Sequence, residues 1–370
     1  MKCQIGDLTR IKTGKLDANA ASENGKYPFF TCSKAPLRID TYSYDCECVL
    51  IAGNGDLNVK YYNGKFDAYQ RTYIIEDASA GRLYMPYLFY FMQGYVEELR
   101  KQAIGGVIKY IKLCNLTEAI IDLPSIQKQQ EIVEHLEKVS IIISQQKKQK
   151  GMLEFLIKAR FVEMFGDLAN PECEWDKYRI IDACTESNDI KCGPFGTQLN
   201  KDEYLSSGVA VWEIPQINMA FQSAPTHYVS KEKAEELKAY SIISGDIAMS
   251  RKGNVGKCAI FPEGLNAGII HSDVLRIRLD TTRIVPEFMM CQLHYSRAVQ
   301  QQIELVSSGA IMAGINVTKL KQIYVYVPPK QLQEQFAAFV HQVDKSKAAV
   351  KKSLDETQLL FDSLMQQYFG

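Results

Sequence analysis

Two long segments of the chain carry apolar residues at alternating steps of four and three. Each begins just after a proline, Pro124 or Pro328–Pro329, and contains no proline further on. This 3.5-residue period predicts two long helices with a coiled-coil seam. About 40 residues at ~1.5 Å each would give a rod of roughly 60 Å. The seam positions are Ile132, Leu136, Val139, Ile143, Leu153, Ile157 and Met164 in the first helix, and Phe336, Val340, Val343, Val350, Leu354, Phe361, Leu364 and Tyr368 in the second.

The regions outside these segments show period-two or continuous apolar runs separated by Gly/Asn turns. Such runs predict strands, and two helical stretches, Met85–Gln102 and Glu287–Glu304, accompany them. Each region is therefore expected to be a mixed α/β globular unit. The predicted strands are Cys48–Ala52, Thr72–Ile75, Ala119–Leu123, Ile247–Ser250, Val274–Leu279 and Ile323–Val327.

The chain also repeats itself. Placing Gly105 on Gly309 aligns the sequence without a gap as far as Gly166 on Gly370, and it superposes Pro124 on Pro328. The expected fold class is α/β with a pseudo-twofold internal repeat, in which two globular domains are separated by two long antiparallel helices. The alternative is that each helix packs only onto its own domain. The expected boundaries are 1–123, 124–166, 167–327 and 328–370.

Composition is that of an ordinary globular protein, with 46% hydrophobic and 23% charged residues among 370. It excludes disordered and collagen-like chains. No apolar stretch is long enough to span a bilayer, and no secretory signal is evident at the start. The ten cysteines lack framework spacing, so we expect reduced thiols and a cytoplasmic location. Cys46 and Cys48 lack the two-residue gap of a zinc knuckle.

Motifs for catalysis are missing from the sequence. Gly253–Lys257 lacks the spacing of a phosphate loop, and no G-x-G-x-x-G follows a strand. Asn170-Pro171 does not continue into the tetrapeptide with which amino-methyltransferases hold a flipped base. The histidines show neither metal spacing nor pairing with a nucleophile; they are His135, His227, His271, His294 and His341. We expect a chain that catalyses no reaction and binds no metal or cofactor itself.

Three loops are rich in side chains that suit nucleic acid. Arginine and lysine bind guanine edges or phosphates, asparagine suits adenine, and glycine permits close approach of the backbone. For each loop taken alone, an ordinary solvent-exposed turn is the alternative. The candidate DNA-binding residues are Arg251, Lys252, Asn254 and Lys257 in one loop, Thr197, Gln198, Asn200 and Lys201 in the second, and Asn54, Asn58 and Lys60 at the corresponding place in the first unit.

Net charge does not add to this hypothesis. The chain has 43 basic and 43 acidic residues, with 15 against 14 in residues 1–123 and 16 against 19 in residues 167–327. A protein so balanced would hold DNA weakly by itself. If it reads DNA, partner subunits should supply much of the contact with phosphates.

Several motifs resemble a known family. The segments Leu123–Ile132 (LPSIQKQQEI) and Val327–Phe336 (VPPKQLQEQF) look like the strand-to-helix junctions of the specificity (S) subunits of type I restriction-modification enzymes. Gly245–Gly253 and Ser308–Asn316 resemble two further elements of that family. The first unit departs from the pattern, because Tyr44–Cys48 stands where a Gly-Asp pair is expected.

The resemblance implies that each globular unit is a target recognition domain reading one half of a split, asymmetric site in double-stranded DNA. The helices would set the gap between the half-sites and recruit two methyltransferase (M) subunits, and restriction (R) motor subunits would join them. Adenosylmethionine, ATP and Mg²⁺ would belong to those partners. Candidate M contacts, for which a solvated helix face is the alternative, are Lys147, Lys148, Lys351 and Lys352.

Two other functions remain open at this point. One is the specificity subunit of a type IIB-like system, which would read DNA in the same way. The other is a coiled-coil scaffold whose globular units bind proteins.

Overall fold

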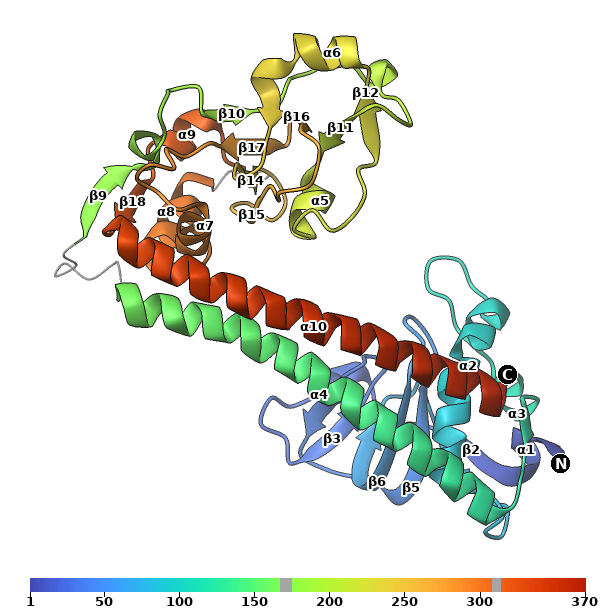
Figure 1. Ribbon diagram of the computed structural model, residues 1–370. Coiled ribbons are helices and arrows are strands. Elements are labelled where there is room, and N and C mark those ends of the chain that lie inside the picture. Colours follow the sequence, from blue (N-terminus) through green and yellow to red (C-terminus); the bar gives the residue numbers. More distant parts are fainter. Residues whose placement is uncertain (167–174, 308–313) are drawn as a thin grey trace. The chain divides into compact units, whose positions relative to one another are not determined.

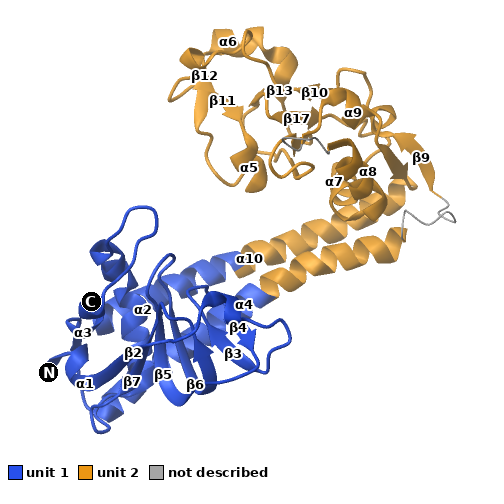
Figure 2. Ribbon diagram, turned by 180° about the vertical axis from the view of Figure 1, so that it is seen from behind, with its two compact units in different colours: residues 1–148, 351–370 blue, residues 149–350 orange. Residues whose placement is uncertain are grey.

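The computed structural model describes residues 1–166, 175–307 and 314–370. They form two compact units, which Figure 2 distinguishes by colour: unit 1 contains residues 1–148 and 351–370, and unit 2 contains residues 149–350. In the described part of the chain, no helix is both long and apolar enough to cross a membrane. Residues 308–313 of the motif at Ser308–Asn316, and Asn170-Pro171, lie outside the described residues.

Unit 1 is built on a six-stranded sheet with the order β2-β7-β5-β6-β3-β4. Neighbouring strands are antiparallel, except that β3 and β6 are parallel. Helix α2 (Met85–Gln102) has the bounds that the sequence predicted, and its buried residues share one core with Val49, Ile51 and Ile75 of the sheet. The strands are β2 (Thr9–Thr13), β3 (Tyr27–Phe30), β4 (Leu37–Ile39), β5 (Tyr44–Ala52), β6 (Val59–Ala68) and β7 (Thr72–Asp77).

Short elements complete unit 1 beside this sheet. Strand β1 (Lys2–Gln4) pairs antiparallel with β8 (Ile120–Asp122). The remaining helices are α1 (Ile5–Leu8), η1 (Ala18–Ala20) and α3 (Leu113–Thr117). Both chain ends lie in this unit (Figure 1).

Unit 2 contains two four-stranded sheets, ordered β10-β17-β14-β15 and β12-β11-β16-β13, and the strand pair β18-β9. Their strands are β9 (Asp176–Arg179), β10 (Ile190–Cys192), β11 (Val209–Trp212), β12 (His227–Val229), β13 (Ser241–Ile242), β14 (Ile247–Ser250), β15 (Cys258–Ile260), β16 (Gly268–Ile270), β17 (Val274–Ile277) and β18 (Tyr324–Val327). The short helices are η2 (Ile180–Ala183), η3 (Lys201–Glu203), α5 (Ile214–Asn218), α6 (Lys231–Glu236), η4 (Lys238–Tyr240), α7 (Pro286–Tyr295), α8 (Arg297–Ser307) and α9 (Val317–Lys321).

The internal repeat is visible in the strand connections. The order β2-β7-β5-β6 in unit 1 matches β10-β17-β14-β15 in unit 2, and β1-β8 matches β9-β18. Two buried glutamines, Gln129 and Gln333, occupy equivalent places. Each accepts a 2.9 Å hydrogen bond from a backbone amide at the start of a helix, that of Tyr84 or Val285. The predicted repeat is therefore confirmed down to individual side chains.

The two long helices are α4 (Ile126–Phe165) and α10 (Lys330–Phe369), each of 40 residues. Within each unit their segments lie side by side and run antiparallel (Figure 1). In unit 1, His135 Nδ1 lies 3.2 Å from the Tyr368 hydroxyl, and the Gln146 side chain donates to Ser353 Oγ over 2.8 Å. The predicted antiparallel pairing is thus confirmed, and the alternative of separately packed helices is wrong.

One predicted helix is divided in two. The sequence predicted Glu287–Glu304 as a single helix, but α7 ends before Ser296, whose backbone is extended (φ −73°, ψ 115°), and α8 follows. The Gln300 side chain donates to the carbonyl oxygen of Leu293 and so satisfies a group at the end of α7. Capping by a side chain further along the chain leaves no trace in hydrophobic periodicity, so the sequence did not reveal this break.

Candidate nucleic-acid interface

The structure brings together the two candidate loops of unit 2. The loop 193–201 follows β10 and the loop 251–257 follows β14, and both strands pair with β17. The Arg251 guanidinium lies over the Phe195 ring, 5.3 Å from its centroid, and Arg251 Nη1 donates to the Ser272 carbonyl oxygen over 3.1 Å. A cation above an exposed aromatic ring is an arrangement that suits stacking against bases.

Gly193 allows the first loop to pass close to neighbouring backbone. A Cβ atom at this position would lie 2.3 Å from the carbonyl oxygens of Ile270 and His271. No other residue fits without a shift of the backbone, so this glycine fixes where Phe195 emerges.

Charged side chains of both signs surround Arg251. Lys252 Nζ forms a 2.8 Å ion pair with Asp273, and the backbone amide of Asp273 donates to His271 Nδ1 over 3.2 Å. The backbone amide of Arg251 donates to the Asp273 carbonyl oxygen over 3.0 Å. Asp273 therefore holds two of the predicted cations in place and also lowers the positive charge of the site.

Two predicted contact residues of the first loop have structural partners. Gln198 Oε1 accepts hydrogen bonds from the Tyr240 hydroxyl (2.9 Å) and the Phe195 amide (3.3 Å). Asn200 caps η3. The other predicted residues of the two loops, Thr197, Lys201, Asn254 and Lys257, are exposed.

The corresponding residues of unit 1 are more enclosed. Asn58 Nδ2 donates to the carbonyl oxygens of Cys32 and Asp56, both over 2.8 Å, and Asn58 Oδ1 accepts from Lys60. Burial lowers the pKa of Lys60. Asn54, which is half-buried, forms an isolated β-bridge with Tyr110. In unit 1, Asn58 and Lys60 thus stabilise the turn after β5 instead of extending from it.

Sequence reasoning missed four side chains of the unit 2 site: Phe195, Tyr240, His271 and Asp273. Phe195 lies between Pro194 and Gly196 within a loop that was already singled out, and an aromatic residue in such a loop was the available signal. The other three come from distant segments, and nothing in the local pattern connects them to the two loops.

The candidate partner-contact lysines, Lys147, Lys148, Lys351 and Lys352, are all exposed on α4 and α10. Exposed apolar side chains accompany them along the same helices. Phe155 and Leu359, which the internal repeat relates, are 70% and 69% exposed, and Leu156 and Leu360 follow them. The exposed surface of these helices therefore offers a partner both apolar and basic side chains.

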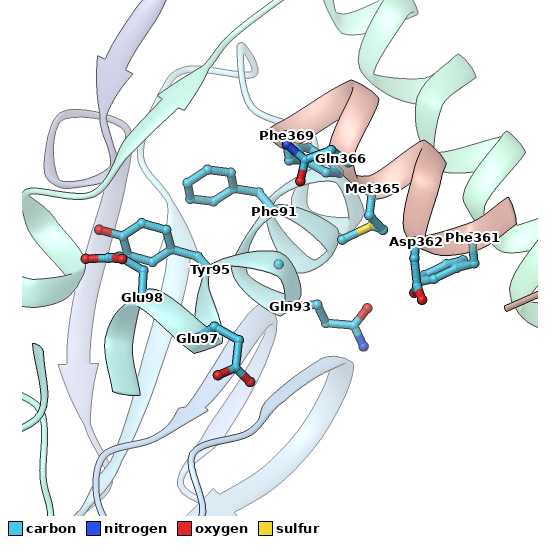
Figure 3. Close-up of a pocket in the computed structure, with 12 residues that line it drawn as sticks. Phe91, Gln93, Tyr95, Glu97, Glu98, Phe361, Asp362, Met365, Gln366 and Phe369 are labelled. Carbon is cyan, nitrogen blue, oxygen red and sulfur yellow. The ribbon is translucent and has the colours of Figure 1, made fainter. Parts of the chain in front are cut away.

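A cavity of about 550 Å³ lies in unit 1 between α2 and the last turns of α10 (Figure 3). Rings of Phe91 and Phe369, whose centroids are 6.1 Å apart, contribute to its lining together with Met365. Its carboxylates are Glu97, Glu98 and Asp362, and the first two pair with Arg100 and Lys101 of the same helix. The described residues contain no group of three His, Cys, Asp or Glu side chains that could hold a metal ion.

Comparison with protein families gives a match over most of the chain. A family model described as the type I restriction modification DNA specificity domain matches residues 1–151 and 174–357.

Two relatives with assigned names show the same likeness. Over 151 residues the chain is 38% identical to the type I restriction enzyme EcoDI specificity subunit of Escherichia coli, a match that covers 41% of this chain but only 33% of that protein. Over 346 residues it is 21% identical to a putative type I restriction enzyme specificity subunit of Haemophilus influenzae, covering 90% and 83% of the two chains.

Solved structures share the fold. The S subunit of the type I restriction-modification system from M. genitalium matches with a TM-score of 0.64 at 17% identity, over 100% of this chain and 96% of that one. A chain from a study of complex assembly and conformational transition in a type I restriction-modification system gives a TM-score of 0.56 at 16% identity, over 100% and 97%.

Proposed function

Because this chain belongs to the type I restriction-modification DNA specificity family, we propose that it is the DNA-reading subunit of such a system. Each globular unit reads one half of a split, asymmetric site in double-stranded DNA. The chain itself catalyses no reaction. Methylation and cleavage belong to partner subunits, which carry adenosylmethionine, ATP and Mg²⁺, and the complex works in the cytoplasm.

The observation that carries the proposal is the site around Arg251 and Phe195. Arg251 is held by the carbonyl oxygen of Ser272 and lies against an exposed ring, and Lys252, Asn254 and Lys257 follow in the same loop. Rigidly held arginine and exposed lysine and asparagine are the side chains that read base edges and position phosphates. The family match leads us to expect that the chain binds DNA, and this site contains side chains that are suited to bind it.

The helices supply the proposed spacing. A helix of 40 residues extends about 60 Å, which exceeds one duplex turn of ~34–36 Å. We infer that α4 and α10 set the number of unread base pairs between the half-sites. Two M subunits dock on these helices, with the lysines and exposed apolar residues as contacts, and R subunits join the assembly.

The chain's near-zero net charge agrees with this division of labour. Forty-three basic side chains balance forty-three acidic ones, and the phosphate backbone dominates the affinity of most DNA-binding proteins. Partner subunits therefore provide a large part of the grip on phosphates, while this chain provides the selection of sequence.

The test is a base-resolution map of methylated adenine in a methylation-free host that expresses the chain with its cognate methyltransferase, compared with methyltransferase alone. We expect methylation at one split motif only when the chain is present. Arg251→Ala should lower methylation at that motif or relax one half of it, whereas Lys238→Ala, an exposed cation of the same unit paired with Glu235, should not.

Three results would count against the proposal in different ways. Co-purification of the two proteins without sequence-selective methylation would favour the scaffold function. Failure to co-purify would contradict the recruitment of M subunits. Excision of DNA on both sides of the site would indicate a type IIB-like system, although methylation in such a system would be the same.

A further inference from the structure

A short projecting finger follows α2 in unit 1. Ile104 and Tyr110 exchange two backbone hydrogen bonds, from the Ile104 amide to Tyr110 oxygen (3.0 Å) and from the Tyr110 amide to Ile104 oxygen (2.9 Å). The five residues between them close the loop, and Gly105 adopts a positive φ of 116° there. In Figure 1 the finger is the teal loop that extends beyond the end of α2.

The finger is attached to the turn that follows β5. The amide of Gly55 donates to the Lys109 oxygen over 3.0 Å, and the amide of Ile111 donates to the Gly53 oxygen over 2.9 Å. Asn54, a candidate DNA contact, forms a β-bridge with Tyr110 between these two bonds. The finger and the candidate reading turn are therefore one hydrogen-bonded structure.

The same attachment occurs in unit 2. There the amide of Ile315 donates to the Arg251 oxygen over 3.1 Å, and Lys252 forms a β-bridge with Gly314. The repeat relates Ile111 to Ile315, so Gly53 and Asn54 correspond to Arg251 and Lys252. The finger of unit 1 is therefore attached at the position where unit 2 has Arg251 and Lys252.

The tip of the finger is apolar and is exposed to an unusual degree. Val107 is fully exposed and Ile108 is 62% exposed. Exposed Lys109 lies on its returning side, and exposed Lys112 follows the finger in the chain. The nearby carboxylate, Asp56 in the attached turn, is already paired with Lys34 (3.2 Å) and Arg100 (3.3 Å).

Apolar side chains with adjacent cations suit a nucleic-acid groove. DNA-binding proteins insert aliphatic wedges beside base steps while lysines meet the flanking phosphates. A protein partner could also pack against the apolar tip, but the lysines beside the tip suit the phosphates of DNA better than an apolar protein surface. Continuity with the turn at Asn54 favours DNA.

We propose that the finger 104–110 contacts DNA in the half-site read by unit 1, with Val107 and Ile108 entering a groove and Lys109 on a phosphate. This inference rests on the proposed function of the chain as a DNA reader. It adds a contact element that is not among the loops singled out from the sequence.

The experiment uses the complex of the full chain with its methyltransferase. Its probes are a duplex carrying the motif that the wild-type complex methylates and a duplex in which the unit 1 half of that motif is scrambled. Binding is measured by fluorescence anisotropy at several salt concentrations. Discrimination is the ratio of the affinities for the two duplexes. We expect the double variant Val107→Ser/Ile108→Ser to lower this ratio about tenfold, an effect comparable to that of one mismatched base pair.

A matched control and two further variants sharpen the test. Ile120→Ser changes another isoleucine of unit 1, 56% exposed and in β8, and should leave discrimination unchanged. Gly105→Ala should reduce it, because the new Cβ would lie 2.6 Å from the Ile108 oxygen, whereas Gly106→Ala meets no atom within 4 Å and should cost less. Lys109→Ala should lower the slope of log affinity against log salt by about 1.

The outcomes separate this inference from the function on which it rests. Wild-type discrimination that is retained in Val107→Ser/Ile108→Ser and in Gly105→Ala would overturn the finger proposal and leave the proposed function intact. Loss of methyltransferase co-purification in these variants would also overturn it, because the tip would then be a protein contact. Absence of discrimination by the wild-type complex would overturn both.

Discussion

Single buried side chains carry much of the repeated architecture. Gln129 and Gln333 are fully buried at the first turns of α4 and α10. Each amide donates to the carbonyl oxygen of the proline before its helix, Pro124 over 2.9 Å and Pro328 over 2.8 Å, and also to a carbonyl before α2 or α7. Each glutamine therefore ties the start of a long helix to the globular part of its unit.

Removing either glutamine should destabilise its unit. Gln129→Ala leaves the Tyr84 amide and two carbonyl oxygens without partners in a buried place, and we expect the free energy of unfolding to fall by about 2–3 kcal/mol. Urea denaturation measures this loss, with Lys128→Ala, an exposed neighbour, as control. An unchanged midpoint for Gln129→Ala would show that the buried amide makes no net contribution.

A buried histidine is expected to make unit 2 less stable in acid. His294 accepts a 3.2 Å hydrogen bond from the Cys258 amide through Nε2, and burial lowers the pKa of His294 to about 4. In the unfolded chain the pKa returns to about 6.5, so the unfolded state binds more protons between these values. Stability should therefore fall as the pH falls from about 6.5 to 4, by about 3 kcal/mol in total.

The measurement is urea denaturation at pH 7 and pH 5. His294→Gln keeps an acceptor near the Cys258 amide but cannot titrate, so its stability should change less between the two pH values than that of the wild type. Equal pH dependence in both proteins would assign the acid sensitivity to other groups.

At the scale of elements, the two helices were the most predictable part of the molecule. Their seam residues Leu136, Val139, Phe336 and Val340 are buried as the 3.5-residue period requires. Apolar residues at this period lie on one face of a helix, and that face is the one that packs against the rest of the protein. The strands β3 and β4, which lie at one end of the sheet in unit 1, were not predicted. Each is only three or four residues long, and β3 joins the rest of the sheet through β6, which lies about 30 residues further along the chain.

The helices should act as a ruler. Duplicating one heptad in each, residues 144–150 together with 350–356, lengthens both by about 10 Å, preserves the phase of the stripe and keeps the four candidate contact lysines. We expect the unread gap in the methylated motif to grow by about three base pairs, at ~3.4 Å per pair. Methylation mapping reads the gap directly. A motif with an unchanged gap would contradict the ruler, and duplication in one helix alone should abolish methylation instead of lengthening the gap.

At the scale of the whole molecule, the repeat explains how one chain builds two related globular units. Helix α4 begins in unit 1 and ends in unit 2, and α10 begins in unit 2 and ends in unit 1. The sequence revealed this plan because the junctions at Pro124 and Pro328 repeat almost residue for residue. It did not reveal how the candidate site is assembled, since Arg251 meets Cys192 and Phe195 from the segment around the end of β10, and Ser272 from the turn after β16, only once the chain has folded.

The central claim is that the two units read DNA independently, and one exchange tests this proposal most directly. Residues 1–123 are replaced by the corresponding unit of a specificity subunit that reads a different motif, and the chimera is expressed with its methyltransferase in a methylation-free host. Our account predicts that base-resolution mapping finds one half of the motif changed, with the other half and the gap retained. A motif changed in both halves, or unchanged in both while methylation persists, would contradict it.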